Sequence, residues 1–433
     1  MGALHWSIIA KRTSKRSPVL RRRRASTSTP ISYDEWEMTN FPSNFQTQPR
    51  EEDQNPEWKG ENQNKRDGKE GRAKYEWDFT LSAVVSPTAA AGAAVPDSLS
   101  AVEFDPSDTL LATGGISRKI RLYSVKRLLV HEEEGKDNLG EQDSKNIPTL
   151  DNTRACEYYI CTPAKLSSLR WRPNSGGQFL GSGDYDGVVM EYDLERRMAV
   201  FERDEHGGRR VWSVDYSHWD PVTGASGSDD GTMQLWDPRC DGGGSVAAVQ
   251  PGGSRSPVCS VEFNPFGGAL VVAGSADRKA YGYDIRKMVD PVFVLDGHCK
   301  PVTYARFLGA STMVSSGTDG CLKLWNVDDL RMIRTFRGHV NTRNFVGLSA
   351  WRNGGLIGCG SETNQVYVYD RRWGEPVWVH GFGVSGESRS GRGFVSSVGW
   401  RQVGEEECTL VAGGSDGVLR VFVGKKRPSS ATG

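Results

Sequence analysis

Apolar and polar residues alternate in short runs along most of this chain, and the runs recur in a fixed order. A strand of small residues leads into a tight turn and then into a strand that ends in an aromatic residue, most clearly from Ser228 to Asp237. The closing aromatic occurs seven times, at Tyr123, Tyr192, Trp236, Tyr283, Trp325, Tyr369 and Phe422. A period of about 40–45 residues with a Trp-Asp ending is typical of a four-stranded propeller blade.

The strand that opens each repeat supports this interpretation. Val211–Tyr216 and Val302–Phe307 alternate apolar and polar residues, and each precedes a strand of small residues such as Val272–Ser275. Small side chains there allow neighbouring blades to pack closely around a central channel. The pattern therefore predicts an all-β fold, a seven-bladed WD-repeat β-propeller over residues 73–424.

The last repeat predicts how the ring closes. From Val395 to Val423 it shows only three strands, whereas Tyr75–Leu81 is a strand-like segment with no repeat of its own. We expect this segment to be the fourth strand of the last blade, because pairing there removes open sheet edges.

Three segments fall outside the repeats. Residues 1–72 are rich in polar and basic residues and poor in clustered apolar ones, so they are predicted to be a disordered extension. Residues 131–155 lie in the long interval between the first two aromatics and are predicted to be an acidic surface loop. Residues 425–433 are predicted to be a short tail.

The turn before each aromatic strand carries an acidic residue in five of the seven repeats. In the third repeat, His206, Ser213, Asp230 and Trp236 predict the buried hydrogen-bond network that is typical of this repeat. A His, a Ser and an Asp also fit a hydrolase, but the same spacing recurs in weaker form at His298, Asp319 and Trp325, which favours a structural role.

The amino-acid composition and the spacing of its residue types exclude several classes of protein. Lys plus Arg equals Asp plus Glu at 54 each, so the chain is not a polycation made for nucleic acid. No run of 18 apolar residues exists that could span a membrane. Neither the eight scattered cysteines nor the glycine-rich stretches have the spacing of a zinc site, a disulfide framework or a phosphate loop. We therefore expect no cofactor, no metal and no enzyme activity.

The basic N-terminus has two interpretations besides a solvated tail. Lys11-Arg12, Lys15-Arg16 and Arg21–Arg24 fit a nuclear-import patch. Arg- and Ser-rich segments without acidic residues are also typical of organellar transit peptides. We expect the protein in the nucleus and the cytoplasm.

Longer strings resemble known families. The propeller of the plant constitutive-photomorphogenesis ubiquitin ligase is similar at Cys161–Leu169, Gly183–Gly187, Arg210–Asp215, Gly338–Asn341 and Cys359–Tyr369. The RING finger and heptad segment of that ligase are missing. Glu76–Ser82, Arg203–Trp212 and Glu375–Trp378 resemble the stand-alone propellers of the plant repressor of UV-B photomorphogenesis family more closely. The resemblance covers roughly residues 73–424.

The resemblance to the ligase implies a pocket for extended Val-Pro peptides flanked by acidic residues. Matched motif by motif, the pocket positions here are Lys165, Tyr185, Trp212, Lys300 and Phe345. Aromatic walls suit a Val-Pro pair, whose pre-set backbone loses little entropy on binding. The alternative is that these aromatics are ordinary blade packing. Thr342 stands where the related pocket has an acidic residue, so charge selectivity is expected to differ.

A second motif, Trp-Asp-x-Arg, resembles the box by which WD-repeat receptors are proposed to dock on cullin-RING ligase adaptors. It comprises Asp237 with Arg239, and Asp284 with Arg286 as a variant. The same residues also occur in the generic repeat, so both interpretations stay open.

The resemblances imply a non-enzymatic repressor of UV-B signalling. It would bind the Val-Pro tail of the UV-B photoreceptor and promote the photoreceptor's return to its inactive dimer. The ubiquitin ligase and a cullin-RING adaptor are further expected partners. The alternative is a substrate receptor of a cullin-RING ligase that targets photomorphogenic transcription factors.

Overall fold

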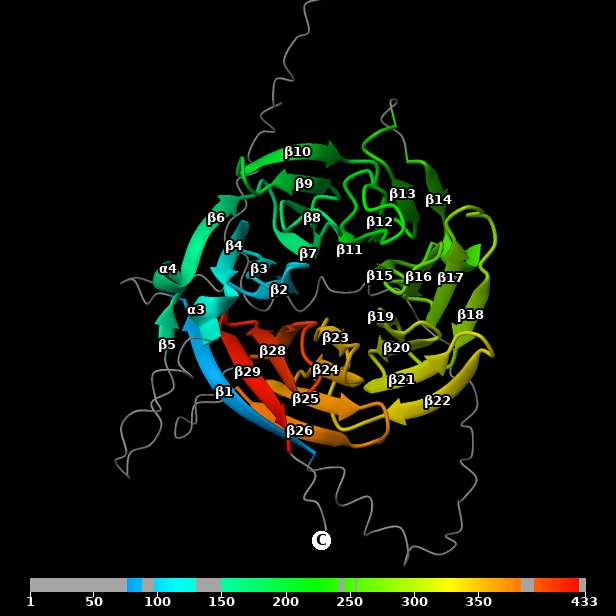
Figure 1. Ribbon diagram of the computed structural model, residues 1–433. Coiled ribbons are helices and arrows are strands. Elements are labelled where there is room, and N and C mark those ends of the chain that lie inside the picture. The colour runs from blue at the N-terminus through cyan, green and yellow to red at the C-terminus, as the bar shows by residue number, and fades with distance from the viewer. Residues whose placement is uncertain are drawn as a thin grey trace, which may run out of the picture. The chain divides into compact units, whose positions relative to one another are not determined.

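Seven antiparallel sheets form a ring in the computed structural model, each with one strand innermost (Figure 1). The structure describes residues 76–87, 97–129, 149–240, 245–253, 255–382 and 393–427. Residues 1–72 and the basic clusters within them lie outside this part. The predicted seven-bladed propeller is confirmed, and the seven closing aromatics are all buried.

The first three blades follow the chain from the inside of the ring outward. Blade 1 consists of β2 (Leu99–Phe104), β3 (Leu110–Gly115), β4 (Lys119–Ser124) and β6 (Cys156–Cys161). Blade 2 consists of β7 (Leu166–Trp171), β8 (Phe179–Asp184), β9 (Val189–Asp193) and β10 (Met198–Arg203). Blade 3 consists of β11 (Val211–Tyr216), β12 (Gly224–Ser228), β13 (Met233–Trp236) and β14 (Ala247–Val249).

Three more blades repeat this order. Blade 4 consists of β15 (Val258–Phe263), β16 (Leu270–Ser275), β17 (Lys279–Asp284) and β18 (Phe293–Asp296). Blade 5 consists of β19 (Val302–Gly309), β20 (Thr312–Gly317), β21 (Cys321–Asn326) and β22 (Arg331–Phe336). Blade 6 consists of β23 (Leu348–Trp351), β24 (Leu356–Gly360), β25 (Gln365–Asp370) and β26 (Pro376–Gly381).

Blade 7 joins the two ends of the propeller. It contains β27 (Val395–Trp400), β28 (Glu407–Gly414), β29 (Leu419–Lys426) and β1 (Trp77–Ser86), with β1 antiparallel to β29 (Figure 1). The predicted closing strand is confirmed, and it is longer than expected. Trp77 and Phe79 bury their rings between blades 6 and 7, where Trp77 meets Trp351 edge-on at a ring-centroid distance of 5.3 Å.

The predicted loop over residues 131–155 is wrong in its last part. Residues 149–151 form a short strand, β5 (Thr149–Asp151), which pairs in parallel with the outer edge of β1. A single helical turn, α4 (Asn152–Ala155), follows and is capped by Asp151, whose side chain accepts a hydrogen bond from the Thr153 amide. Residues 130–148 lie outside the described residues. Before them, α3 (Val125–Leu129) buries Val125 and Leu128.

Small residues in the second strands bring the blades together, as predicted. A Cβ added at Gly183 in β8 would lie 2.6 Å from Cγ1 of Val211 in the next blade. The turn after the second strand needs a positive φ. In blade 3, between β12 and β13, Gly231 supplies it at 83° directly after Asp230. The Asp-Gly pair therefore sets the turn that leads into the aromatic strand.

Candidate peptide-binding site

The five predicted pocket residues lie on one face of the ring. Within a blade, the segment before the inner strand and the turn between the second and third strands lie at the same end, because successive strands are antiparallel. We call this end the entry face and the opposite end the exit face. Lys165, Lys300 and Phe345 precede β7, β19 and β23, Trp212 is the second residue of β11, and Tyr185 follows β8.

Three of the five residues form an aromatic slot. The rings of Trp212 and Phe345 are stacked, with centroids 4.4 Å apart and planes inclined by 16°. Tyr185 lies on the other side of Trp212, with a centroid distance of 6.3 Å. Tyr304, which the sequence analysis did not single out, meets Phe345 edge-on at 5.7 Å. The slot therefore draws side chains from four blades that are far apart in the sequence.

Arg210 is a fifth component, and sequence reasoning missed it. Its guanidinium carbon lies 4.4 Å from the ring centroid of Tyr185 and 4.5 Å from that of Trp212. Its Nε and Nη1 atoms are buried and have no hydrogen-bond partner within the described part of the chain. Buried donors normally have a partner. Arg210 thus offers two unused donors beside the slot, and its position two residues before Trp212 is the signal that could have identified it.

Hydrogen bonds hold Trp212 in place. Its indole Nε1 donates to Asp229 Oδ1 at 2.5 Å. The Asp229 amide in turn donates to the Arg210 carbonyl at 2.9 Å, and the Tyr185 amide donates to the Lys165 carbonyl at the same distance. Burial raises the pKa of Asp229 although Trp212 and Arg210 oppose this. The slot is therefore built on fixed turns and needs little ordering when a ligand arrives.

The two lysines precede inner strands on the same face as the slot. Lys165 is half-buried and Lys300 is exposed, and neither forms an ion pair with another described residue. Near Thr342 a carboxylate is present after all, on Glu362. Its oxygens accept hydrogen bonds from the Thr342 hydroxyl at 2.6 Å and from the Arg343 amide at 2.9 Å. Partial burial opposes ionisation, but these bonds together hold the pKa of Glu362 below its usual range.

The predicted network of blade 3 is wrong in two residues, Ser213 and Trp236. His206 Nδ1 lies 2.8 Å from Asp230 Oδ2, as expected, but His206 Nε2 contacts Ser226 Oγ at 2.8 Å and not Ser213. The indole nitrogen of Trp236 has no hydrogen-bond partner among the described residues. The complete set occurs in blade 5, where Ser315 Oγ lies 2.8 Å from both His298 Nε2 and Trp325 Nε1.

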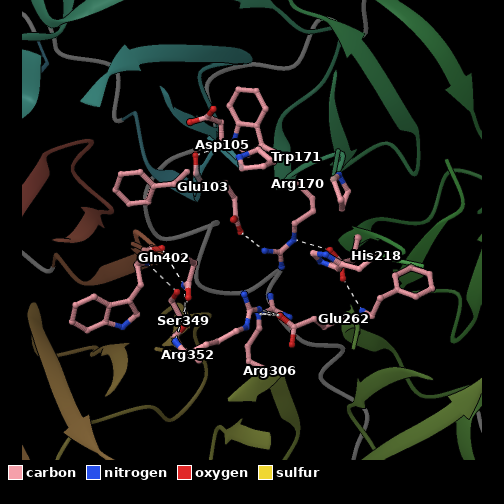
Figure 2. A pocket seen from close by; sticks show the side chains of 18 of the residues that line it. Glu103, Asp105, Arg170, Trp171, His218, Glu262, Arg306, Ser349, Arg352 and Gln402 are labelled. Atoms are coloured by element: carbon pink, nitrogen blue, oxygen red, sulfur yellow. Dashed lines mark hydrogen bonds and ion pairs between the residues drawn. The ribbon is translucent and has the colours of Figure 1, made fainter. Parts of the chain in front are cut away.

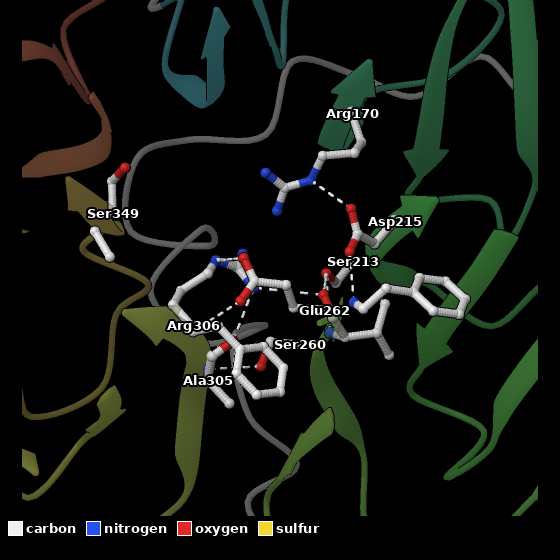
Figure 3. Close-up of polar contacts among 12 residues, drawn as sticks. Arg170, Ser213, Asp215, Ser260, Glu262, Ala305, Arg306 and Ser349 are labelled. Atoms are coloured by element: carbon white, nitrogen blue, oxygen red, sulfur yellow. Dashed lines mark hydrogen bonds and ion pairs between the residues drawn. The ribbon is translucent and has the colours of Figure 1, made fainter. Parts of the chain in front are cut away.

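Ser213 joins two blades instead. Its hydroxyl accepts a hydrogen bond from the Val261 amide of the next inner strand at 3.1 Å. Ser260 repeats this contact one blade further on and accepts from the Ala305 amide at 3.0 Å (Figure 3). Ser213 faces the neighbouring inner strand because side chains alternate along a strand, so it cannot also face the histidine.

Charged side chains form a layer inside the ring near the exit face. Glu103, Arg170, Asp215, Glu262 and Arg306 each stand one residue before the last aromatic of an inner strand. Arg170 bridges Glu103 at 2.8 Å and Asp215 at 3.0 Å, so it joins three blades (Figure 2). They line a cavity of about 330 Å³, to which blade 6 adds Arg352, 3.2 Å from Glu262.

Burial shapes the charges of this layer. It raises the pKa of Glu103 against the attraction of Arg170, and it lowers the pKa of Arg306, which also faces Arg170. Each charge is close to one of opposite sign, as expected of buried ions. We therefore regard the layer as a cross-link between blades. The sequence analysis missed it, although a charged residue before the inner-strand aromatic recurs in five blades.

The comparisons with known proteins agree with this architecture. Residues 94–124 and 198–237 match the family model of the WD domain, G-beta repeat, and residues 222–370 match that of the nucleolar protein 10-like N-terminal domain. The chain is 64% identical to WD repeat-containing protein RUP2 of Arabidopsis thaliana over 77% of its own length and 89% of the relative. The chain belongs to the RUP family of WD repeat-containing proteins. The resemblance stated from the sequence is confirmed.

Two further relatives are similar to this RUP-family chain at lower identity. WD repeat-containing protein RUP1 of Arabidopsis thaliana is 57% identical over 82% of the chain and 86% of the relative. The E3 ubiquitin-protein ligase COP1 of the same plant is 34% identical over 75% of the chain, which corresponds to 44% of the ligase. The predicted likeness to the ligase propeller is confirmed at this lower level. The RUP relationship makes the chain a WD-repeat regulator of the UV-B pathway.

The Trp-Asp-x-Arg residues of the RUP-family chain form compact forks on the exit face. Arg239 Nε lies 2.9 Å from Asp237 Oδ1, and Arg286 Nε lies 2.9 Å from Asp284 Oδ1. The sequence analysis missed a third fork in blade 6, in which Arg372 Nε lies 2.9 Å from Asp370 Oδ1. The occurrence of this Asp–Arg fork in three blades supports the interpretation that it belongs to the generic repeat. The Arg286 side chain nevertheless remains 77% exposed, so its outer face is open to a partner.

The described residues offer little further chemistry. No helix there is long and apolar enough to cross a membrane. No group of three His, Cys, Asp or Glu side chains in the same part could hold a metal ion. The arrangement that the structure does offer is an aromatic slot with a cationic rim, which suits binding of an extended peptide.

Proposed function

We propose that this protein represses the UV-B response by binding the Val-Pro tail of the UV-B photoreceptor in the aromatic slot. The bound photoreceptor would be released from activating partners and returned to its inactive dimer. No bond is made or broken, so the protein acts as a binding module and not as an enzyme. Membership of the RUP family supports the pathway, and the slot supports the mode of binding.

The observation that carries the proposal is the stack of Trp212 on Phe345 beside Arg210, whose Nε and Nη1 have no hydrogen-bond partner among the described residues. Stacked rings 4.4 Å apart present flat apolar walls, which suit a proline ring and a valine side chain. The free donors of Arg210 are placed to bind backbone carbonyls of an extended peptide, which has no internal hydrogen bonds of its own.

The charges around the slot favour acidic residues next to the Val-Pro pair. Three carboxylates of the entry face are already engaged, Asp229 with Trp212, Asp230 with His206 and Glu362 with Thr342. Lys165 and Lys300 form no ion pair with any described residue. The two lysines therefore contribute positive charge beside the slot, which attracts acidic flanks of a peptide, and the exposed Asp186 next to Tyr185 adds a negative charge to the same face.

Titration of the full chain with a fluorescent peptide from the photoreceptor tail tests the proposal. Trp212→Ala should reduce the affinity by ~2–4 kcal/mol, because buried aromatic anchors dominate such interfaces. Trp219→Ala is the matched control, since Trp219 is 73% exposed and lies in the turn between β11 and β12 on the exit face. Equal binding by the folded Trp212→Ala variant and the parent would exclude the slot.

Competition with the related ligase follows from the shared propeller. COP1 is an E3 ubiquitin-protein ligase whose matching segment is 34% identical to this chain. We infer that both propellers take the same tail, so occupancy of this protein would withdraw the photoreceptor from the ligase. Adding the ligase propeller to the labelled complex should displace the peptide, and a complex of all three without displacement would contradict the inference.

A second candidate function is that of a substrate receptor on a cullin-RING ligase. The exposed outer face of Arg286 favours it, because the fork with Asp284 fixes the guanidinium while leaving it accessible. Under this proposal, Arg286→Ala should weaken binding to the ligase adaptor, whereas Lys287→Ala beside it should not. Equal adaptor binding by both variants would show that the Asp284–Arg286 fork does not bind the adaptor and has only a structural role in the repeat.

We further propose that the protein is nuclear with a cytoplasmic fraction. The basic clusters that support this, such as Lys11-Arg12 and Arg21–Arg24, lie outside the described residues. Fluorescent fusions with and without residues 1–33 test it, and a plastid or mitochondrial signal from the full chain would overturn it.

A further inference from the structure

The outer strands of the blades differ in how well their free edges are protected. Exposed edges invite pairing with other chains, and proteins protect them with short strands, proline, charges or a covering segment. Here β14 has three residues and β18 has four, β26 begins with Pro376, and β5 covers the edge of β1. Full-length edges therefore remain at β6, β10 and β22 in the described part of the chain, each with one irregularity in its pairing to the neighbouring strand.

The strand β22 differs from the other two in its charge. β6 carries the acidic Glu157, and β10 carries Glu202 beside Arg203. In β22 both charged residues, Arg331 and Arg334, are cationic. Arg337 directly follows the strand. The charged side chains within β22 are therefore all positive.

Two cations at this edge lack anionic partners. Lys323 is only 8% exposed, and its ammonium donates to the Met332 sulfur at 3.6 Å. Among the described residues no carboxylate forms an ion pair with Lys323 or Arg334. The Nε of Arg334 is buried without a hydrogen-bond partner in the same part of the chain. A buried lysine without an acid is unfavourable unless a partner supplies one.

The acidic residues of the nearby turns do not fill this role. Asp319 is engaged by His298 at 3.0 Å, and Asp296 pairs with Lys279 at 3.0 Å. Asp329 pairs with Arg331 at 3.5 Å on the exposed side of the strand. The positive charge under β22 is therefore left for a group from outside the blade.

The same edge exposes apolar side chains. Met332 is 45% exposed and Ile333 is 41% exposed. Ile333 is the extra residue of a β-bulge, because its neighbours Met332 and Arg334 pair with the adjacent residues Trp325 and Leu324 of β21. Leu330, in the turn before the strand, is 48% exposed. An added strand would cover part of both faces with alternate side chains, which is how edge addition gains specificity.

This chain already shows that a blade edge can accept one more strand. β5 pairs in parallel with β1 through Val84 opposite Thr149, Val85 opposite Leu150 and Ser86 opposite Asp151. That contact leaves blade 7 with five strands where the other blades have four. The free edge of β22 has six residues, which is twice the length of β5.

We propose that the free edge of β22 binds an extended, acidic segment of another protein as a fifth strand. Carboxylates of the segment pair with Lys323 and Arg334, and its apolar residues cover Met332 and Ile333. A second copy of this chain is the less suitable occupant, because two β22 edges would bring like charges together. The site is separate from the aromatic slot and does not depend on its function.

A defined peptide tests this proposal on the full chain. The probe is a fluorescent ten-residue peptide of alternating Glu and Val, and the control peptide has Lys in place of Glu. The acidic probe should bind and the basic one should not. Hydrogen exchange should slow for the amides of residues 331–336 and stay unchanged for those of β10. Failure of the acidic probe to bind, or protection confined to another strand, overturns the proposal.

Two variants separate the edge from other positive surfaces. Arg334→Glu should lower the affinity for the acidic probe by at least about five-fold, as expected for reversal of one partly buried charge. Arg196→Glu changes the net charge equally in the turn before β10 and should leave binding within about two-fold, since that residue is solvent-exposed. If Trp212→Ala abolishes binding of the probe while Arg334→Glu does not, the peptide occupies the aromatic slot and the edge site is excluded.

Lys323→Met gives a readout that a merely structural role cannot produce. The substitution keeps the length of the side chain and removes a buried unpaired charge, so the melting temperature should rise or stay equal. Binding of the acidic probe should fall in the same variant. Loss of stability together with unchanged binding would show that Lys323 serves only the fold.

Discussion

The indole ring of Trp212 lies against the phenyl ring of Phe345, with centroids 4.4 Å apart and planes inclined by only 16°. The two residues come from blade 3 and from the segment before blade 6, so they meet across the ring. Neither is fully buried, although both are large apolar side chains. A stacked aromatic pair that remains open to solvent at the centre of one face is suited to receive a ligand.

The stacked pair should act as one unit in binding. Trp212→Ala and Phe345→Ala should each weaken binding of the Val-Pro peptide. The double variant should lose less binding free energy than the sum of the two single losses, because each ring positions the other. We expect a coupling of about 0.5–3 kcal/mol, the range for residues in direct contact. Isothermal titration of the four proteins measures it, and strictly additive losses would show that the rings bind independently.

The rim lysines should contribute less, and their contribution should depend on salt. Lys165→Ala should cost roughly 0.5–1 kcal/mol of binding free energy at low salt, because an exposed pair is weak. The difference from the parent should shrink as ionic strength rises. Lys287→Ala, an exposed lysine on the exit face, is the control and should bind as the parent does at every salt concentration.

Truncation of the N-terminus should affect stability in two steps. Deleting residues 1–72 should leave thermal unfolding nearly unchanged, because β1 begins at Trp77. Deleting residues 1–82 removes Trp77 and Phe79 from the core between blades 6 and 7. Loss of one buried aromatic typically costs ~3–5 kcal/mol, so the shorter protein should melt far lower. Differential scanning calorimetry decides, and equal melting of both would contradict ring closure by β1.

Mild acid should destabilise the fold through His339. Burial lowers the pKa of His339 from its ordinary value of 6.5 to about 4. The folded state thus favours the neutral ring, so its stabilising effect is full above pH 6.5 and declines as pH falls from 6.5 towards 4. Between pH 7 and pH 5 the loss should be about 2 kcal/mol.

Urea unfolding of the parent and of His339→Phe at both pH values isolates this effect from that of other histidines. The variant should lose less stability than the parent on going from pH 7 to pH 5. An identical loss in the two proteins would show that His339 titrates normally in the folded state.

The two histidine networks should tolerate loss of their serines unequally. Ser315→Ala removes the hydroxyl that contacts both His298 and Trp325, whereas Ser226→Ala removes a partner of His206 alone. Each buried group left without a partner costs about 1–3 kcal/mol, so Ser315→Ala should be the more destabilising. Chemical denaturation compares them, and a greater loss for Ser226→Ala would reverse this ranking of the networks.

The sequence specifies the repeat well because every blade repeats it. Seven aromatics at a regular spacing, and the strand at residues 77–81 with no blade of its own, suffice to predict the ring and its closure. The serine of the histidine network could not be chosen in this way. Ser213 and Ser226 lie on neighbouring strands, and only the face to which each side chain points decides which one meets His206.

The aromatic slot was accessible from the sequence only through the resemblance to a related propeller. Trp212, Tyr185 and Phe345 belong to different blades, and no spacing along the chain indicates that they meet. Arg210 went unnoticed because its position two residues before Trp212 does not by itself show that its guanidinium lies over the Tyr185 and Trp212 rings. The strand β5 was missed for a similar reason, since three residues at the end of an acidic stretch show no alternation.

The pairing of β1 with β29 determines when the propeller can close during synthesis of the chain. The Thr80 hydroxyl reaches the Val423 carbonyl across 343 positions of the chain, at 3.5 Å. At ~5–20 residues per second, a ribosome needs about 20–70 seconds to synthesise the stretch between them. Throughout that interval Trp77 and Phe79 have no blade to enter. A nascent chain of this protein therefore presents two aromatic side chains to chaperones until β29 has been synthesised.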